Sequence, residues 1–119
     1  MFKFEKLNIW QKAMEYADFI YRVTRSFPAE ERFGLTSQLR RSAVSVSSNI
    51  AEGSSRSSDI DLARFIEIAY GSLLESVSEL GIAKSQQFLN EVDFKIAYDK
   101  AENLSKMLSG FRRTLKKRS

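Results

Sequence analysis

The strongest constraint in this sequence is the spacing of its apolar residues, which recur every three or four positions through four long segments. The third segment shows the rhythm most regularly, with apolar side chains at Ile66, Tyr70, Leu73, Val77 and Leu80. This spacing places side chains on one stripe of an α-helix, and no segment alternates with the period of two that is typical of a β-strand. The sequence therefore predicts an all-α protein.

Helix-breaking and helix-capping residues separate the four segments. Pro28 disfavours helical geometry in the residue before it, Gly53 suits the position just after a helix, and Ser58 with Asp61 resembles an N-terminal capping box. We predict helices over residues 6–27, 34–52, 58–87 and 91–116. Short connections favour antiparallel neighbours, so the expected fold is a single-domain, antiparallel, up-down-up-down four-helix bundle.

Two missing residue types narrow the possible functions, because the chain contains neither cysteine nor histidine. Their absence removes disulfides, thiolate and imidazole metal ligands, and the usual general base at neutral pH. No glycine-rich phosphate loop or HExxH spacing occurs either, so we expect a protein that is not an enzyme and holds no metal or cofactor. No apolar run approaches the ~20 residues of a membrane span, and we expect a cytoplasmic protein with no membrane contact.

The net charge of +4 hides an uneven distribution along the chain. Up to Phe111 there are 14 Lys and Arg residues against 15 Asp and Glu, so the body of the chain is nearly neutral. The remaining positive charges form a basic C-terminal tail, residues 112–119, with Arg112, Arg113, Lys116, Lys117 and Arg118. Such a tail could neutralise phosphates of RNA or DNA without reading their sequence. It could equally complement the negative end of a helix dipole.

The second predicted helix carries a row of polar residues beside its apolar stripe. The row has spacings of four, three, four and three, and consists of Gln38, Ser42, Ser45, Asn49 and Glu52. Serine gains nothing from burial unless it is hydrogen-bonded, so the row needs polar partners. It is either a recognition face for a ligand or nucleic acid, or a polar seam between helices.

The pair Arg40–Arg41 lies near the start of this row. Guanidinium groups suit phosphate because they donate hydrogen bonds in a planar fork, which makes both residues candidates for nucleic-acid contact. The alternative is an ion pair with acidic residues of the third predicted helix, either within the chain or between subunits.

The first predicted helix has more apolar surface than one bundle uses. Its apolar residues cover an arc of roughly 220°, whereas a core-facing stripe usually needs about 100–140°. We expect the surplus side to be exposed in a monomer and to form an oligomer interface through Ile9, Tyr16, Phe19 and Val23. The alternative is that this helix is simply the most buried of the four.

Three stretches of the sequence resemble a known family: WQKA at residues 10–13, FPAEERFGLTSQLRRSAVSVSSNIAEG at 27–53 and ARFIEIAYGSLLE at 63–75. They are similar to the bacterial four-helix bundle proteins encoded in intervening sequences of 23S ribosomal RNA genes. The resemblance implies an antiparallel four-helix bundle and a ring-like homopentamer. The family's polar signature is matched here by Gln38, Arg40, Arg41, Ser45, Asn49, Glu52 and Gly53. Ser47 departs from the pattern, since members often have proline there.

The family also looks distantly related to the accessory variability determinant proteins of retroelements, which associate with a reverse transcriptase and nucleic acid. The functional hypothesis is therefore a non-catalytic, oligomeric, nucleic-acid-associated protein whose partners are its own copies and RNA or DNA. The alternative is a protein–protein adaptor or scaffold for a reverse transcriptase or another nucleic-acid-processing enzyme.

Overall fold

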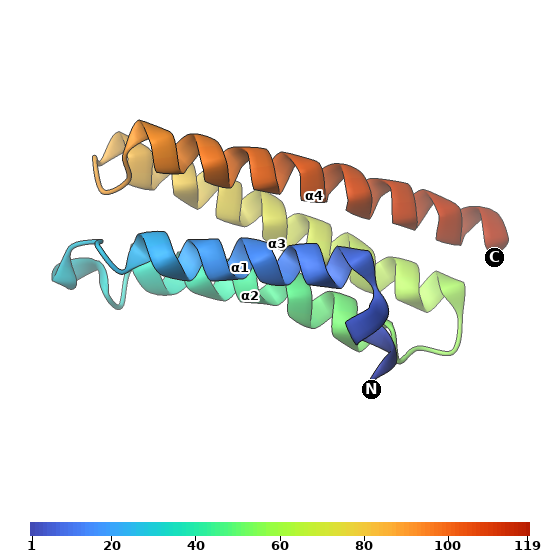
Figure 1. The fold of residues 1–119 in the computed structure, drawn as a ribbon. Coiled ribbons are helices and arrows are strands. Elements are labelled where there is room, and N and C mark those ends of the chain that lie inside the picture. Colours follow the sequence, from blue (N-terminus) through green and yellow to red (C-terminus); the bar gives the residue numbers. More distant parts are fainter.

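The computed structural model describes all 119 residues and contains four long helices and no β-strand. The long helices are α1 (Asn8–Thr24), α2 (Leu35–Gly53), α3 (Asp59–Ser85) and α4 (Glu91–Arg118), and two short 3₁₀ helices are η1 (Lys3–Lys6) and η2 (Ala29–Glu31). Consecutive long helices run in opposite directions along a molecule of 45 × 22 × 21 Å (Figure 1). The predicted antiparallel up-down-up-down bundle is confirmed.

One apolar core runs along the bundle and draws on all four helices. Ile20, Leu39, Leu73 and Leu108, one from each helix, are completely buried. Burial of each such side chain stabilises the fold by about 1.5–3 kcal/mol relative to exposure, so the predicted apolar stripes supply most of the driving force. None of the helices combines the length and the apolar character needed to cross a membrane.

The two longest helices begin at side-chain caps. The Ser58 hydroxyl accepts a hydrogen bond from the Asp61 amide at 3.1 Å, and Asn90 Oδ1 accepts one from the Asp93 amide at 2.7 Å. Each cap satisfies an amide that has no partner inside its helix. The α3 helix ends in a Schellman motif, with Gln87 in the left-handed region at φ 66°.

The helix α1 ends at Thr24, three residues before the predicted end at Phe27. The Thr24 hydroxyl donates to the Ile20 carbonyl at 2.8 Å, and the next amides bond to carbonyls three residues back rather than four. The chain has therefore left the α-helix before Pro28, which begins the turn into η2.

The role predicted for Gly53 is wrong, because this residue is the last of α2 rather than a left-handed cap beyond it. A Cβ atom at this position would lie 2.7 Å from Phe65 Cβ and 2.9 Å from Leu62 Cδ1. Glycine is needed here because α3 crosses directly over the end of α2.

The prediction that one apolar side of the first helix is exposed in a monomer and forms an oligomer interface is also wrong. Ile9, Tyr16, Phe19 and Val23 are all buried in the core of the single chain. At 100° per residue, the buried positions of α1 span roughly 160°, from Phe19 to Ala17. The apolar surplus lies on the opposite edge of the arc, where Met14 and Tyr21 remain exposed.

Packing by neighbouring helices explains this difference. The width of an apolar arc follows from the sequence, but its rotation depends on which helices lie on either side. The Phe19 ring, at one limit of the buried arc, is covered by cationic side chains, with Arg22 Cζ 5.1 Å and Lys100 Nζ 5.8 Å from its centroid. Their aliphatic stems exclude water from an edge that the sequence alone left open.

The predicted basic tail is helical. The α4 helix continues to Arg118, and Leu115 is completely buried within these last turns. Residues 112–118 therefore belong to the packed bundle, which fixes the backbone that carries their charges.

Candidate nucleic-acid interface

An open groove near the C-terminal end of α4 gathers four of the eight basic side chains of that helix. Its lining contains no hydrophobic residue and consists of Ser109, Arg112, Arg113, Lys116 and Lys117. These positions are three, four, seven and eight residues apart, so helical geometry places them on one side of α4. The groove therefore presents four cationic groups to one ligand.

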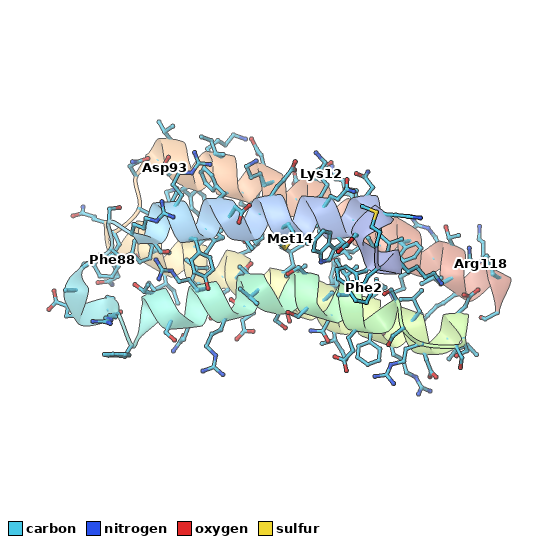
Figure 2. The ribbon with its side chains drawn as sticks, turned by 60° about the horizontal axis from the view of Figure 1, so that its bottom comes forward. Phe2, Lys12, Met14, Phe88, Asp93 and Arg118 are labelled. Atoms are coloured by element: carbon cyan, nitrogen blue, oxygen red, sulfur yellow. The ribbon has the colours of Figure 1, made fainter.

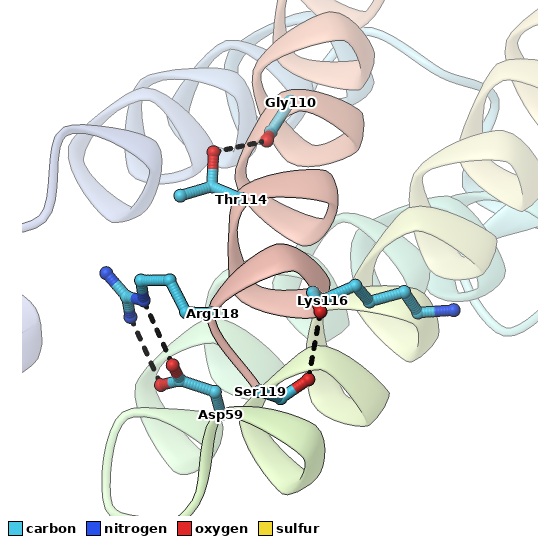
Figure 3. A network of polar contacts seen from close by, with 6 residues as sticks. All are labelled: Asp59, Gly110, Thr114, Lys116, Arg118 and Ser119. Carbon is cyan, nitrogen blue, oxygen red and sulfur yellow. Dashed lines mark hydrogen bonds and ion pairs between the residues drawn. The ribbon is translucent and has the colours of Figure 1, made fainter.

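Two acidic residues of α3 neutralise part of the positive charge at this end of α4. Arg112 Nε donates to Glu67 Oε1 at 2.7 Å, and Lys116 Nζ lies 3.3 Å from the same oxygen. Figure 3 shows the guanidinium of Arg118 forking onto both carboxylate oxygens of Asp59, at 2.9 and 3.1 Å. Hydrogen bonds from Arg112 and Arg118 lower the pKa values of Glu67 and Asp59, so both carboxylates stay ionised at neutral pH.

Arg113 and Lys117 have no ion-pair partner in the chain. They lie four residues apart, one helical turn, and both are exposed. The last turns of α4 thus carry five cations against two acids, which leaves an excess of positive charge at this end of the bundle.

Sequence reasoning missed a further cation at this end. The positive charge of Lys3, in η1, contributes to lowering the pKa of Asp59, the acid that pairs with Arg118. Both chain termini lie at the same end of the bundle in Figure 1. An up-down-up-down bundle with an even number of helices has both termini at the same end. The predicted topology could therefore have indicated that Lys3 lies at the same end as the basic segment of α4.

The other predicted phosphate ligands lie elsewhere. Arg40 Nε donates to the Thr24 hydroxyl at 2.8 Å, and its guanidinium carbon lies 4.7 Å from the centroid of the Tyr21 ring. Arg41 is exposed and forms no ion pair, so neither arginine pairs with an α3 acid within the chain. At 1.5 Å per residue the pair lies about 30 Å along the bundle from Arg118. One chain does not bring the two basic groups together.

Three members of the polar row on α2 form hydrogen bonds along the interface with α3. The Ser42 hydroxyl donates to Glu79 Oε1 at 2.5 Å, Ser45 and Ser72 share a hydrogen bond at 2.8 Å, and Asn49 Nδ2 donates to the Ser45 carbonyl at 2.8 Å. We call these residues the polar seam. The hydrogen bonds of the polar seam use the side chains of Ser42, Ser45 and Asn49. A recognition face would need these side chains free to bind a ligand.

The two ends of the row differ from its middle. Gln38 is exposed, and Glu52 is exposed and pairs with Arg56 at 3.3 Å one turn further along. Both side chains therefore lie on the surface beyond the polar seam.

A second buried polar contact joins α1 to α3. The hydroxyls of Tyr16 and Ser76 are 2.6 Å apart, and Ser76 also donates to the Leu73 carbonyl at 2.6 Å. Burial raises the pKa of Tyr16 to about 12, so the phenol stays protonated. Burial also raises the pKa of Glu79, against the opposing effect of the Ser42 hydrogen bond. Ser76 and Glu79 lie beside the apolar stripe of α3. Their positions in the sequence could therefore have indicated that both side chains are buried.

No group of three or more acidic side chains comes together that could hold a metal ion. The groove on α4, whose walls are cationic and polar, suits an anion such as phosphate through charge-assisted hydrogen bonds.

Comparison with known proteins identifies the family. A structure similar to this chain is that of a protein of unknown function from the S23 ribosomal protein family of Bacteroides thetaiotaomicron VPI-5482. The two chains are 20% identical with a TM-score of 0.81, covering 87% of this chain and 97% of the other, which supports the fold. No curated protein matches the chain. The family model described as 23S rRNA-intervening sequence protein matches residues 5–110. The chain therefore belongs to the family of 23S rRNA-intervening sequence proteins.

Proposed function

We propose that this protein is a non-catalytic, self-assembling bundle that associates with nucleic acid through phosphate contacts at the basic end of α4. The observation that carries the proposal is the open groove lined by four cations, of which Arg113 and Lys117 are unpaired. Membership of a family linked to 23S ribosomal RNA intervening sequences is consistent with a nucleic-acid partner.

The chemistry of the groove supports phosphate contact without base recognition. Arginine can donate two parallel hydrogen bonds to a phosphate, and lysine adds a compact positive charge. The groove offers no amide, carboxylate or aromatic side chain with which to read base edges or stack on bases. Binding should therefore be sensitive to salt and nearly indifferent to sequence.

Self-assembly is part of the proposal, because several copies would present several basic ends to one nucleic acid. Linked weak contacts strengthen binding through effective concentration, without any new contact in each copy. The number of copies that the family resemblance implies is five.

The experiment reverses the two unpaired charges and measures RNA binding. We expect Arg113→Glu combined with Lys117→Glu to weaken binding of a fluorescent RNA hairpin about tenfold or more at low salt. The slope of log affinity against log salt should fall by about two, roughly one for each lost phosphate contact. Both side chains are exposed, so the change should leave the fold intact.

The matched control is Arg25→Glu combined with Arg32→Glu, which makes the same charge change at exposed positions at the opposite end of the bundle. Fluorescence anisotropy should give nearly parental affinity for this variant. Equal weakening by both pairs, or no binding by the parent at low salt, would contradict the proposal. Capture of a specific protein that survives nuclease treatment would then favour the adaptor alternative.

A further inference from the structure

Four large apolar side chains on the outer side of α3 are left about half uncovered by the rest of the chain. Ile60, Ile68, Leu74 and Ile82 are each 47–55% exposed. At 100° per residue they fall within an arc of roughly 120°, so they form one stripe, which we call the α3 face. Arg64 and Glu67 interrupt the face between Ile60 and Ile68. A row of half-exposed large apolar side chains on one side of a helix is nevertheless typical of an interaction surface.

The glycines of α3 support the same conclusion. A Cβ atom built at Gly71, in the middle of the α3 face, would meet no atom within 4 Å, and the same holds at Gly81. Glycine inside a helix costs about 1 kcal/mol relative to alanine, and nothing in the chain requires it at either position. Close approach of another chain would supply the reason, as the approach of α3 does at Gly53.

A second exposed apolar surface lies where α1 and α2 pack side by side. Met14, Tyr21 and Val44 are each 37–40% exposed there, and we call them the α1–α2 edge. Figure 2 shows Met14 between the ribbons of the two helices. The cation–π contact with Arg40 holds the Tyr21 ring in place, so the edge is preformed.

The two surfaces lie at the same level along the bundle. Tyr16 is hydrogen-bonded to Ser76 and α1 runs parallel to α3, so Met14 lies level with Leu74 and Tyr21 lies close to the level of Ile82. The contacts of Ser42 and Ser45 with α3 likewise place Val44, on α2, close to the level of Leu74. A copy moved sideways, without a shift along the bundle, brings apolar residues onto apolar residues.

Two charges beside these surfaces are complementary. Glu75, next to Leu74, and Arg41, three residues before Val44, are both exposed and have no ion pair within the chain. The bond from Ser42 to Glu79 places Arg41 within about one helical turn, ~5 Å, of the level of Glu75. The chain therefore carries both halves of one interface, matched in apolar character, level and charge.

We propose that the α3 face of one copy packs against the α1–α2 edge of a second copy, with Glu75 paired to Arg41 across the contact. The inference rests on the self-assembly proposed above and names its surfaces. Two different surfaces meet, so the contact is head-to-tail, and it generates a closed ring where the rotation from one copy to the next divides a full turn evenly.

The first test disables each surface separately. Ile68→Glu with Leu74→Glu disables the α3 face, and Met14→Glu with Val44→Glu disables the α1–α2 edge. We expect light scattering to show a monomer for each variant, with the helical circular dichroism unchanged. Mixed in equal amounts, the two variants should form a heterodimer and nothing larger, because one intact surface of each kind remains.

A matched control is Val92→Glu with Ile96→Glu, which places the same charges on exposed apolar positions of α4. This variant should assemble like the parent. Assembly that persists in both surface variants, or a mixture that stays monomeric, overturns the proposed contact. A parent that is itself monomeric overturns self-assembly as a whole, so the two failures are distinguishable.

A charge swap gives a second test that does not depend on large apolar changes. Glu75→Arg alone and Arg41→Glu alone should each raise the dissociation constant of the assembly about tenfold, the effect of losing a charge pair at an interface. The double variant restores opposite charges and should recover most of the loss. No recovery in the double variant overturns the pairing of these residues.

Discussion

Polar side chains inside the bundle fix how its helices are rotated against one another. The Tyr16–Ser76 bond joins α1 to α3, and the Ser42–Glu79 bond joins α2 to α3. A rotated or shifted helix would leave these groups buried without partners, which costs more than the bonds themselves contribute. The residues that looked like a recognition face and an oligomer interface are therefore used to specify the fold.

The first prediction concerns Glu79. Burial raises its pKa, so the folded state binds this proton more tightly than the unfolded chain does. That contribution to stability is full below the unfolded pKa of about 4.3 and is lost as pH rises through the folded pKa. Glu79→Gln should therefore raise the free energy of unfolding at pH 7 by about 1 kcal/mol, the usual scale for one buried polar group.

Urea denaturation at neutral and acidic pH measures this effect. The gain from Glu79→Gln should shrink as pH falls toward the unfolded pKa, because the parent carboxyl is then protonated as well. Glu102→Gln, at an exposed position without an ion pair, serves as the control and should show little change. Equal or lower stability of Glu79→Gln at pH 7 would mean that its burial costs nothing.

The second prediction concerns Gly53. Gly53→Ala places a methyl group against Phe65 and Leu62 at distances that require the end of α2 to move. We expect a loss of about 1–3 kcal/mol in the free energy of unfolding, as for other overpacked sites. Thermal unfolding of the two variants measures the difference. In the control, Gly110→Ala, the added methyl group meets only Arg113 Nη2, at 4.0 Å, so this change should be neutral or stabilising.

At the scale of helices, much could be predicted from the sequence. The three- and four-residue apolar rhythm predicted four helices, and Ser58 marked the start of the third correctly. The rotation of α1 could not be predicted, because burial of Ile9 and Phe19 depends on neighbouring helices that a single segment does not reveal. The end of α1 at Thr24 likewise depends on how the following turn packs.

The candidate site was predictable as a set of charges but not as a surface. Arg112 to Arg118 stood out as a basic segment, yet only the packing of α4 on α3 shows that Glu67 and Asp59 occupy part of it. The same packing leaves Arg113 and Lys117 without an ion-pair partner. Long-range ion pairs of this kind leave no trace in local spacing.

The third prediction follows from the helical state of the C-terminal segment. Removing residues 112–119 should lower the free energy of unfolding by about 2–5 kcal/mol, because buried Leu115 is lost from the core. In the full-length chain, Arg113→Glu with Lys117→Glu should change stability by less than about 0.5 kcal/mol, since both side chains are exposed. A deletion that leaves stability unchanged would show that this segment is a detached tail after all.

The whole molecule is a rod about 45 Å long with its excess positive charge at one end. Both termini lie at that end, and Arg118 marks it in Figure 2, opposite the turn at Phe88. A ring formed without a shift along the bundle would bring the basic ends of all copies to one rim. Assembly would then multiply a modest charge on each copy into a surface that holds nucleic acid.

The most direct test of this account is the salt dependence of RNA binding by the assembled protein. The affinity for a fluorescent RNA hairpin, measured by anisotropy over a range of salt concentrations, gives the number of phosphates neutralised. Basic ends acting together predict a slope of log affinity against log salt of about −3 or steeper. A slope near zero, or no binding at the lowest salt, would contradict the account.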